Sequence, residues 1–273
     1  YLSHKSDKRP GDPRPVMRRK QQKTGGSGAE APGAKGQDGL AVQVPLLSHP
    51  PLILEAEAAT RRGPSHVINE DAFVADAQFG FFVVSDGMGG HRDGQAASST
   101  LTSILGHAFD GHASFEEKVS AASQAISNVN TLLYAPCAAD PTIDISGATV
   151  VVLIVADGYA ACLWAGDSRL YLFRDSELYL ISQDHVADDR TLTRAVGSAP
   201  QIEVERRILE IRAGDMFLLA SDGLLKGLGE PQVSKLLDSY GEGAVERLID
   251  NAIAGGALDD ITVVLVRVER DYG

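Results

Sequence analysis

The sequence is poor in cysteine, in long apolar runs and in the features of a secretory leader, and each shortage excludes a class of protein. Its 273 residues include only two cysteines, Cys137 and Cys162, and these lack metal-ligand spacing. We therefore expect free thiols and no disulfide framework. Because no apolar run approaches ~20 residues and no signal peptide is visible, we expect a cytoplasmic protein without a membrane span.

Basic residues are scarce beyond residue 45, although the first 45 residues are rich in them. The formal net charge is −12 for the whole chain, +5 for residues 1–45 and −17 for the remainder. An acidic body binds nucleic acid poorly, because phosphate backbones require cationic surfaces, but it suits a protein that collects divalent cations. The basic segment could contact nucleic acid, a membrane or an acidic partner, and the simpler interpretation is a solvated tail.

Residues 1–45 also lack any periodic apolar pattern. They are rich in Gly, Pro, Lys, Arg and Gln, a composition typical of a disordered tail or of a linker between domains. From about Leu46 onward, apolar runs of strand and helix length begin. We therefore expect two parts, which are a disordered basic tail or linker over 1–45 and one folded domain over 46–273.

The apolar pattern of the folded part predicts short strands interleaved with pairs of helices. Ser114 and Glu117 form a capping box, and Asp157-Gly158 has the sequence of a type I′ hairpin turn. This order favours an α+β fold with antiparallel sheets. Strands are expected at 52–59, 79–85, 149–156, 159–164, 169–173, 177–181, 204–211, 216–220 and 261–268, and helices at 95–109, from 114 onward, at 231–239 and at 243–254.

Acidic segments end or follow several of these strands. Asp86 follows the apolar residues of VVSDG, Asp222 follows those of LLASDG, and further acids lie in Asn69-Glu70-Asp71, Gly166-Asp167 and Asp259-Asp260. An isolated Asp-Gly pair is most often a turn. Several carboxylates at strand ends, however, would repel one another unless cations neutralise them. Mg²⁺ and Mn²⁺ prefer such oxygen ligands, so the set predicts a divalent-cation centre.

Eight motifs in the folded part are similar to those of one family, and they occur in that family's order from about Ala58 to Val268. Together they are far more specific than any one of them alone. The chain resembles the type 2C, or PPM, metal-dependent protein serine/threonine phosphatases, and its DGMGG variant is similar to the bacterial branch. The motifs are NEDAF (69–73), VVSDGMGGH (83–91), SGAT (146–149), AGDSRLYLFR (165–174), SQDH (182–185), LTRAVG (192–197), LLASDGL (218–224) and DDITVVLV (259–266).

The resemblance implies a sandwich of two antiparallel β-sheets flanked by helices on both sides (α-β-β-α). It also implies a protein serine/threonine phosphatase that hydrolyses phosphoserine and phosphothreonine with a bridging water activated by two Mn²⁺ or Mg²⁺ ions. The partners it implies are phosphorylated proteins, among them a bacterial serine/threonine kinase that the phosphatase opposes and the substrates of that kinase. A monomer is expected.

The resemblance further implies the roles of four residues in the metal centre. Asp86 would bridge both metal ions, and the carbonyl oxygen of Gly87 would bind the second ion. Glycine suits that role because a missing Cβ lets the backbone approach the ion. Asp222 and Asp259 would complete the ligands of the first ion. Asp86, Asp222 and Asp259 are therefore the expected catalytic set.

Three more acids have implied roles at the edges of this centre. Glu70 and Asp71 would serve the second metal ion, either directly or through ordered waters. Asp167 matches the position that, together with Asp222, holds a third and weaker metal ion in relatives. Asp260 stands where the family often has asparagine, and this departure adds one negative charge.

The resemblance also assigns no nucleophilic role to the serines of these motifs. Ser85, Ser168 and Ser221 are expected to make local backbone hydrogen bonds, since the mechanism needs no phosphoenzyme. The leaving alkoxide still needs a proton. Some relatives have histidine directly after the Asp-Gly pair, where this chain has Met88. The general acid is therefore either a metal-bound water or His91, and the sequence leaves both open.

Two departures from the family pattern affect substrate binding. The family usually carries a phosphate-binding arginine three residues before Asn69, where this chain has His66. We consider two interpretations, that His66 binds the substrate phosphate or that it is structural. Relatives also insert a flap subdomain between the positions of His185 and Leu192, whereas this chain has only six residues there. The flap is therefore expected to be short or missing.

Two functions from other classes compete with the phosphatase. One is a regulatory pseudophosphatase that binds partners without turnover, and the loss of metal-binding aspartates would mark it. Every core aspartate is present, which disfavours this alternative. The other is a structural module whose carboxylates bind only Ca²⁺, and no EF-hand spacing supports it.

Overall fold

The computed structural model describes residues 52–89, 92–108, 113–140, 142–189, 191–239 and 241–271. The predicted tail over 1–45 lies outside these residues, and so does His91. None of the helices in the described part of the chain is long and apolar enough to cross a membrane.

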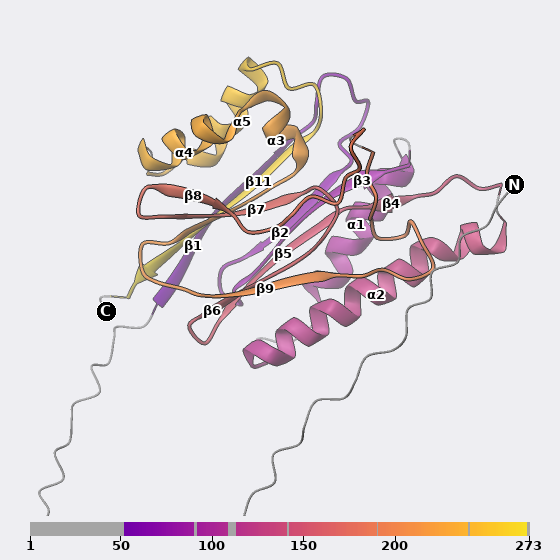
Figure 1. The fold of residues 1–273 in the computed structure, drawn as a ribbon, viewed down its shortest axis with the longest axis horizontal. Coiled ribbons are helices and arrows are strands. Elements are labelled where there is room, and N and C mark those ends of the chain that lie inside the picture. The colour runs from indigo at the N-terminus through magenta and orange to yellow at the C-terminus, as the bar shows by residue number, and fades with distance from the viewer. Residues whose placement is uncertain are drawn as a thin grey trace, which may run out of the picture. The chain divides into compact units, whose positions relative to one another are not determined.

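Two antiparallel sheets form the centre of the fold (Figure 1). The first sheet has the order β1-β11-β10-β7-β8, with β1 at Leu52–Arg61, β11 at Ile261–Arg270, β10 at Met216–Ala220, β7 at Arg169–Arg174 and β8 at Glu177–Leu180. The second has the order β2-β3-β5-β6-β9, with β2 at Asp71–Asp76, β3 at Phe81–Met88, β5 at Val150–Ala156, β6 at Tyr159–Ala165 and β9 at Glu205–Glu210, while the two-residue strand β4 (Gly147–Ala148) pairs with β3.

Helices cover the outer face of each sheet. The second sheet is covered by α1 (Arg92–Gly106) and α2 (Phe115–Ala139), and the first by α3 (Asp222–Gly227), α4 (Glu230–Ser239) and α5 (Ala244–Ala254) (Figure 1). This arrangement is the expected helix–sheet–sheet–helix sandwich.

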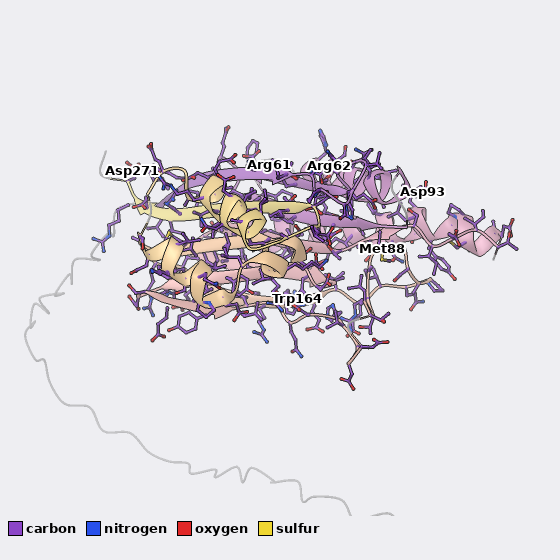
Figure 2. All side chains as sticks on the ribbon, turned by 90° about the horizontal axis from the view of Figure 1, so that it is seen from above. Arg61, Arg62, Met88, Asp93, Trp164 and Asp271 are labelled. Carbon is purple, nitrogen blue, oxygen red and sulfur yellow. The ribbon has the colours of Figure 1, made fainter. Side chains whose placement is uncertain are left out.

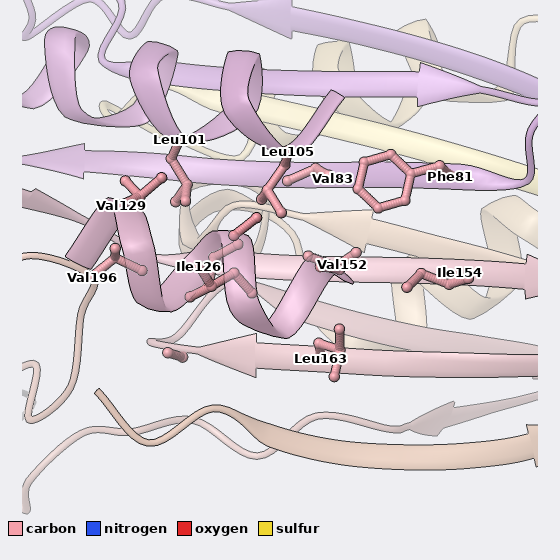
Figure 3. Close-up of a cluster of buried hydrophobic side chains, with 14 of the residues drawn as sticks. Phe81, Val83, Leu101, Leu105, Ile126, Val129, Val152, Ile154, Leu163 and Val196 are labelled. Atoms are coloured by element: carbon pink, nitrogen blue, oxygen red, sulfur yellow. The ribbon is translucent and has the colours of Figure 1, made fainter. Parts of the chain in front are cut away.

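The apolar run of strand β5 is continuous because both faces of the strand are covered. Successive side chains of a strand point to opposite faces. Val152 and Ile154 pack under α1 and α2, in the cluster that Figure 3 shows, whereas Val151 and Leu153 pack between the two sheets. A strand covered on both faces therefore needs apolar residues at every position, and not only at alternate ones.

Local signals in the sequence predicted several turns and caps correctly. Ser114 and Glu117 cap α2 reciprocally, with the backbone N–H of Ser114 donating to Glu117 at 2.8 Å. Asp157 and Gly158 both have positive φ, of 52° and 81°, as a type I′ turn requires. The predicted strands are present, and the four predicted helices correspond to α1, α2, α4 and α5. Strands β2 and β4 and helix α3 were not predicted.

The described residues between His185 and Leu192 make a short connection and form no subdomain. Val186 and Leu192 form an antiparallel bridge, and the N–H of Ala187 donates to the carbonyl of Thr191 at 2.8 Å. The described residues of this segment therefore confirm that the flap is short.

Phe217 on β10 provides a test of the packing between the sheets. It is fully buried in the cluster that joins the two sheets. Phe217→Ala is expected to lower the free energy of unfolding by about 3–5 kcal/mol, because it leaves a cavity in a core that cannot collapse fully. Urea denaturation measures this loss. Phe79→Ala is the control, since Phe79 is 39% exposed. An equal loss in both variants would contradict the assignment of Phe217 to the core between the sheets.

Candidate metal centre

The pairing of β2 with β3 places two of the predicted ligands opposite each other. Asp71, the first residue of β2, lies directly across from Asp86 in the antiparallel register. Side chains of opposed residues share one face of a sheet, so the two carboxylates are brought together. Figure 2 shows Met88, the last residue of β3, at the end of the sheets away from Asp271, which follows β11.

Asp86 lies at the centre of the predicted acidic cluster. Burial raises its pKa well above the usual range, and the negative charges of Asp71, Asp222, Asp259 and Asp167 raise it further. Five carboxylates that are far apart in the sequence therefore act on one another. Such mutual repulsion favours protonation or a bound cation, as was expected for a divalent-cation centre.

Two oxygens of this cluster are buried without a hydrogen-bond partner among the described residues. They are Oδ1 of Asp71 and Oδ1 of Asp222. The other oxygen of Asp71 accepts a hydrogen bond from Oγ of Ser221 at 2.8 Å. Burial raises the pKa of Asp71 to about 7 and also raises the pKa of Asp222. Buried oxygens without donors are rare, and they are the ligands that a hard cation takes.

Glu70 and Gly87 meet where β3 passes close to α1. The N–H of Gly87 donates to the carbonyl of Glu70 at 3.1 Å, and Oγ of Ser98 donates to the same carbonyl at 2.6 Å. A Cβ on Gly87 would lie 2.1 Å from the carbonyl oxygen of Gly94, and one on Gly94 would lie 2.1 Å from Oε2 of Glu70. The two glycines therefore let the backbone and the Glu70 carboxylate pack closely beside Asp86.

The remaining predicted ligands come from three connections between strands. Asp222 follows β10 and is the first residue of α3, and Asp259 precedes β11. Asp167 lies between β6 and β7, where burial, and then the charge of Asp222, raises its pKa to about 6. These positions bring all three toward Asp86, as the strand-end argument predicted.

Buried hydroxyls hold the backbone around the carboxylates. Oγ of Ser85 donates to the carbonyl of Thr149 at 2.8 Å, and Oγ of Ser168 lies 2.7 Å from Oγ1 of Thr149. Oγ1 of Thr149 in turn accepts from the N–H of Asp86 at 3.0 Å. All three motif serines, Ser221 included, are almost fully buried. They are hydrogen-bonding residues, as predicted, but their partners lie far away in the sequence, and Ser168 and Ser221 bond the side chains of Thr149 and Asp71 rather than backbone groups alone.

Lys226 was not predicted as part of the site. Its Nζ lies 2.6 Å from Oδ2 of Asp222 and also contacts Oδ2 of Asp259. Burial lowers the pKa of Lys226, but these two carboxylates raise it by more. The signal was present in the sequence, because a lysine four residues after an aspartate on a helix lies on the same face.

His66 lies between the two adjacent acids at the start of β11. Its Nδ1 is 3.0 Å from Oδ2 of Asp260, and its Nε2 is 3.4 Å from Oδ1 of Asp259. The hydrogen bond to Asp260 raises the pKa of His66, although partial burial lowers it. The N–H groups of Gly63 and Glu70 also donate to Asp260, at 2.8 and 2.7 Å. Although the ligand atoms of His66, Asp259 and Asp260 lie close enough to hold a cation, those of Asp260 are already used.

Two cavities open beside this cluster, and Lys226 lines both. One, of about 280 Å³, is also lined by Ser65, His66, Gly256, Leu258 and Asp259. The other, of about 720 Å³, is also lined by Asp167, Arg169, Asp184, Val186, Asp222, Leu225 and Glu230. Lys226 is therefore a lining residue that the two cavities share.

Comparison with known proteins gives the family. The model of the protein phosphatase 2C family matches residues 62–252. The chain belongs to the protein phosphatase 2C family. The phosphatase PstP of Mycobacterium tuberculosis is a bacterial relative with 31% identity over 245 residues, which cover 81% of this chain and 46% of PstP. The chain thus spans about half the length of that relative.

Two solved structures resemble this protein phosphatase 2C chain. PppA, a key regulatory component of T6SS in Pseudomonas aeruginosa, matches with a TM-score of 0.75 and 32% identity, covering 80% of this chain and all of PppA. The catalytic domain of PstP, solved in complex with two manganese ions, matches with a TM-score of 0.70 and 29% identity, again over 80% of this chain and all of that domain. The predicted bacterial branch is thereby confirmed.

The raised pKa of Asp71 predicts how the stability of the metal-free phosphatase 2C domain depends on pH. A folded-state pKa of about 7 exceeds the usual value for an aspartate, so the folded state binds the proton more tightly than the unfolded state does. The free energy of unfolding therefore falls as pH rises from that usual value to about 7. Asp71→Asn removes this titration and should flatten the decline by about 2 kcal/mol between about pH 5 and pH 7. Thermal melts in EDTA measure it. The exposed Asp144→Asn is the control, and parallel curves for Asp71→Asn and wild type would contradict the prediction.

Proposed function

We propose that this chain is a metal-dependent protein serine/threonine phosphatase. The observation that supports it most is the gathering of four acidic side chains around Asp86, with two buried oxygens of the cluster that have no partner among the described residues. Membership of the protein phosphatase 2C family supports the same activity. The cluster offers oxygen ligands, which Mn²⁺ and Mg²⁺ prefer.

The residues present fit two divalent cations. We assign Asp86, Asp222 and Asp259 to the first ion, and the donors of the second are Asp86, Glu70, Asp71 and the carbonyl oxygen of Gly87. Asp167, together with Asp222, would hold a third and weaker ion. The two manganese ions bound by the related PstP catalytic domain support the count. The partnerless oxygens of Asp71 and Asp222 support the positions.

When bound, the cations would supply Lewis-acid activation of the attacking water and positive charge for the phosphoryl oxygens. The chain's own residues hold the ligands in place for this chemistry. Ser221 fixes one oxygen of Asp71, and Thr149 fixes the backbone of Asp86. Because Ser85, Ser168 and Ser221 are buried and hydrogen-bonded, none is available to form a phosphoenzyme. The general acid is a metal-bound water or His91, which lies outside the described residues.

The proposed substrates are phosphoserine and phosphothreonine proteins, including a bacterial serine/threonine kinase and its targets. The names of the relatives support this substrate class. A cytoplasmic location and a monomeric state are part of the same proposal, and the two free cysteines fit a reducing compartment. The short turn between His185 and Leu192 leaves one side of the site without a flap, so we infer weak discrimination among phosphopeptides.

Asp222→Asn is the direct test of the metal assignment. It removes a ligand charge but no core volume, so the turnover number should fall by roughly a hundredfold or more with little loss of stability. Hydrolysis of p-nitrophenyl phosphate with saturating Mn²⁺ measures it, with the exposed Asp144→Asn as control. Turnover close to wild type would refute the assignment.

The same assay separates the alternative functions. A phosphatase hydrolyses the substrate with Mn²⁺ and not with EDTA. A pseudophosphatase hydrolyses it under neither condition, and a calcium-binding structural module gains stability from Ca²⁺ without turnover. The presence of all the core carboxylates favours the phosphatase.

His66 is proposed to bind the substrate phosphate in place of the family's arginine. A histidine is charged only near or below its pKa, so competitive inhibition by inorganic phosphate should weaken as pH rises from about 6 to about 8. His66→Arg should flatten this trend and tighten phosphate binding by roughly 1–2 kcal/mol. Because phosphate itself ionises in this range, only the difference between the two proteins is diagnostic. Parallel curves would leave His66 as a structural partner of Asp260.

A further inference from the structure

Lys226 has an unusual set of partners. Its hydrogen bonds and ion pairs within the described residues go to Asp222 and Asp259, the two residues that we assign, with Asp86, to the first metal ion. The lysine side chain is 48% exposed, so its ammonium group can leave this position without unfolding α3. The inference below rests on the proposed metal centre.

Both oxygens of the Asp259 carboxylate already accept a hydrogen bond while Lys226 is bound. Its Oδ1 accepts from the N–H of Asp260 at 2.9 Å, and its Oδ2 accepts from Lys226. Asp222 is different, because its Oδ1 has no partner among the described residues. A cation can therefore bind the free Oδ1 of Asp222 directly, whereas at Oδ2 of Asp259 it competes with the ammonium group. Repulsion between the cation and the ammonium acts in the same direction.

The arginine side chains around this part of the molecule are held by groups outside the metal centre. Arg169 donates to both oxygens of Asp184 and to Glu230. Arg61 is paired with Glu246, and Arg62 donates to the carbonyl of His66. Once a metal ion neutralises Asp222 and Asp259, Lys226 is the cationic side chain whose acidic partners have been taken. It lines both cavities, so its stem already reaches the space that a substrate would fill.

We infer that Lys226 exchanges partners during the catalytic cycle. In the metal-free protein its ammonium group neutralises Asp222 and Asp259. Metal binding displaces the ammonium group into one of the two cavities that Lys226 lines, where it binds an oxygen of the substrate phosphate. Lys226 thus makes phosphate binding depend on prior metal binding, and it supplies a positive charge at a site where the position usually held by arginine is occupied by His66.

A single substitution should therefore change two affinities in opposite directions. Lys226→Met keeps the length of the stem and removes the charge. Without a competing ammonium group, Mn²⁺ should bind roughly fivefold to tenfold more tightly. Inorganic phosphate should bind the Mn²⁺-saturated variant roughly tenfold more weakly, because one charge-assisted hydrogen bond is lost. Isothermal titration calorimetry measures both constants on the full chain.

Three further proteins complete the experiment. Lys235→Met is the matched control, because Lys235 is an exposed lysine on the neighbouring α4, and both of its affinities should equal those of wild type. Lys226→Arg keeps the charge and should retain most of the phosphate affinity. Asp222→Asn tests the metal centre itself and should weaken Mn²⁺ binding.

The outcomes separate the two hypotheses. Unchanged Mn²⁺ affinity in Lys226→Met, or unchanged phosphate affinity, overturns the exchange even when Asp222→Asn binds Mn²⁺ more weakly. If Asp222→Asn binds Mn²⁺ as tightly as wild type, the proposed metal centre is wrong and the inference about Lys226 fails with it. Opposite shifts in Lys226→Met, absent in Lys235→Met, support the exchange.

Discussion

Repulsion among carboxylates is the constraint on which the rest of this structure depends. The carboxylates of Asp71, Asp167, Asp222 and Asp259 all act on Asp86, although they come from separate segments of the chain. Burial alone already raises the pKa of Asp86. A fold can keep such a cluster only if other groups neutralise or hold it. Hydroxyls hold Asp71 and the backbone of Asp86, and the ammonium group of Lys226 neutralises the Asp222 side. A divalent cation would complete this compensation.

The sandwich provides the rigidity that this compensation requires. Strands covered on both faces are apolar at every position of their interior, so the first polar residue falls where the strand leaves the core. On β3 and after β10 that residue is a buried serine, Ser85 or Ser221, and the aspartates Asp86 and Asp222 come next. Close backbone approach then fixes the connections, since a Cβ on Gly223 would lie 1.9 Å from the carbonyl oxygen of Asp260. The positions of these metal ligands therefore depend on where the apolar strands end.

Much of the fold could be predicted because its signals are local, whereas the missed parts depend on tertiary contacts. The apolar runs of β3, β5 and β11 and the capping box of α2 are visible within a few residues of sequence. Strand β2 has only six residues with acids at both ends, and its pairing with β3 decides that it is a strand. Helix α3 is likewise only six residues long and begins inside the Asp-Gly motif. Without α3, Lys226 could not be placed beside Asp222.

The neighbouring acids Asp259 and Asp260 show most clearly what sequence alone leaves open. Both are carboxylates directly before β11, and although the family resemblance assigns only Asp259 to a metal ion, no pattern in the sequence gives a role to Asp260. In the structure, Asp260 is buried and accepts the backbone N–H groups of Gly63 and Glu70, so it fixes the segment that leads into β2. Asp259 instead contacts Lys226 in the acidic cluster. The two carboxylates thus differ in their partners, because Asp260 holds the backbone whereas the Asp259 side chain shares an ammonium group with Asp222, a partner that a cation can replace.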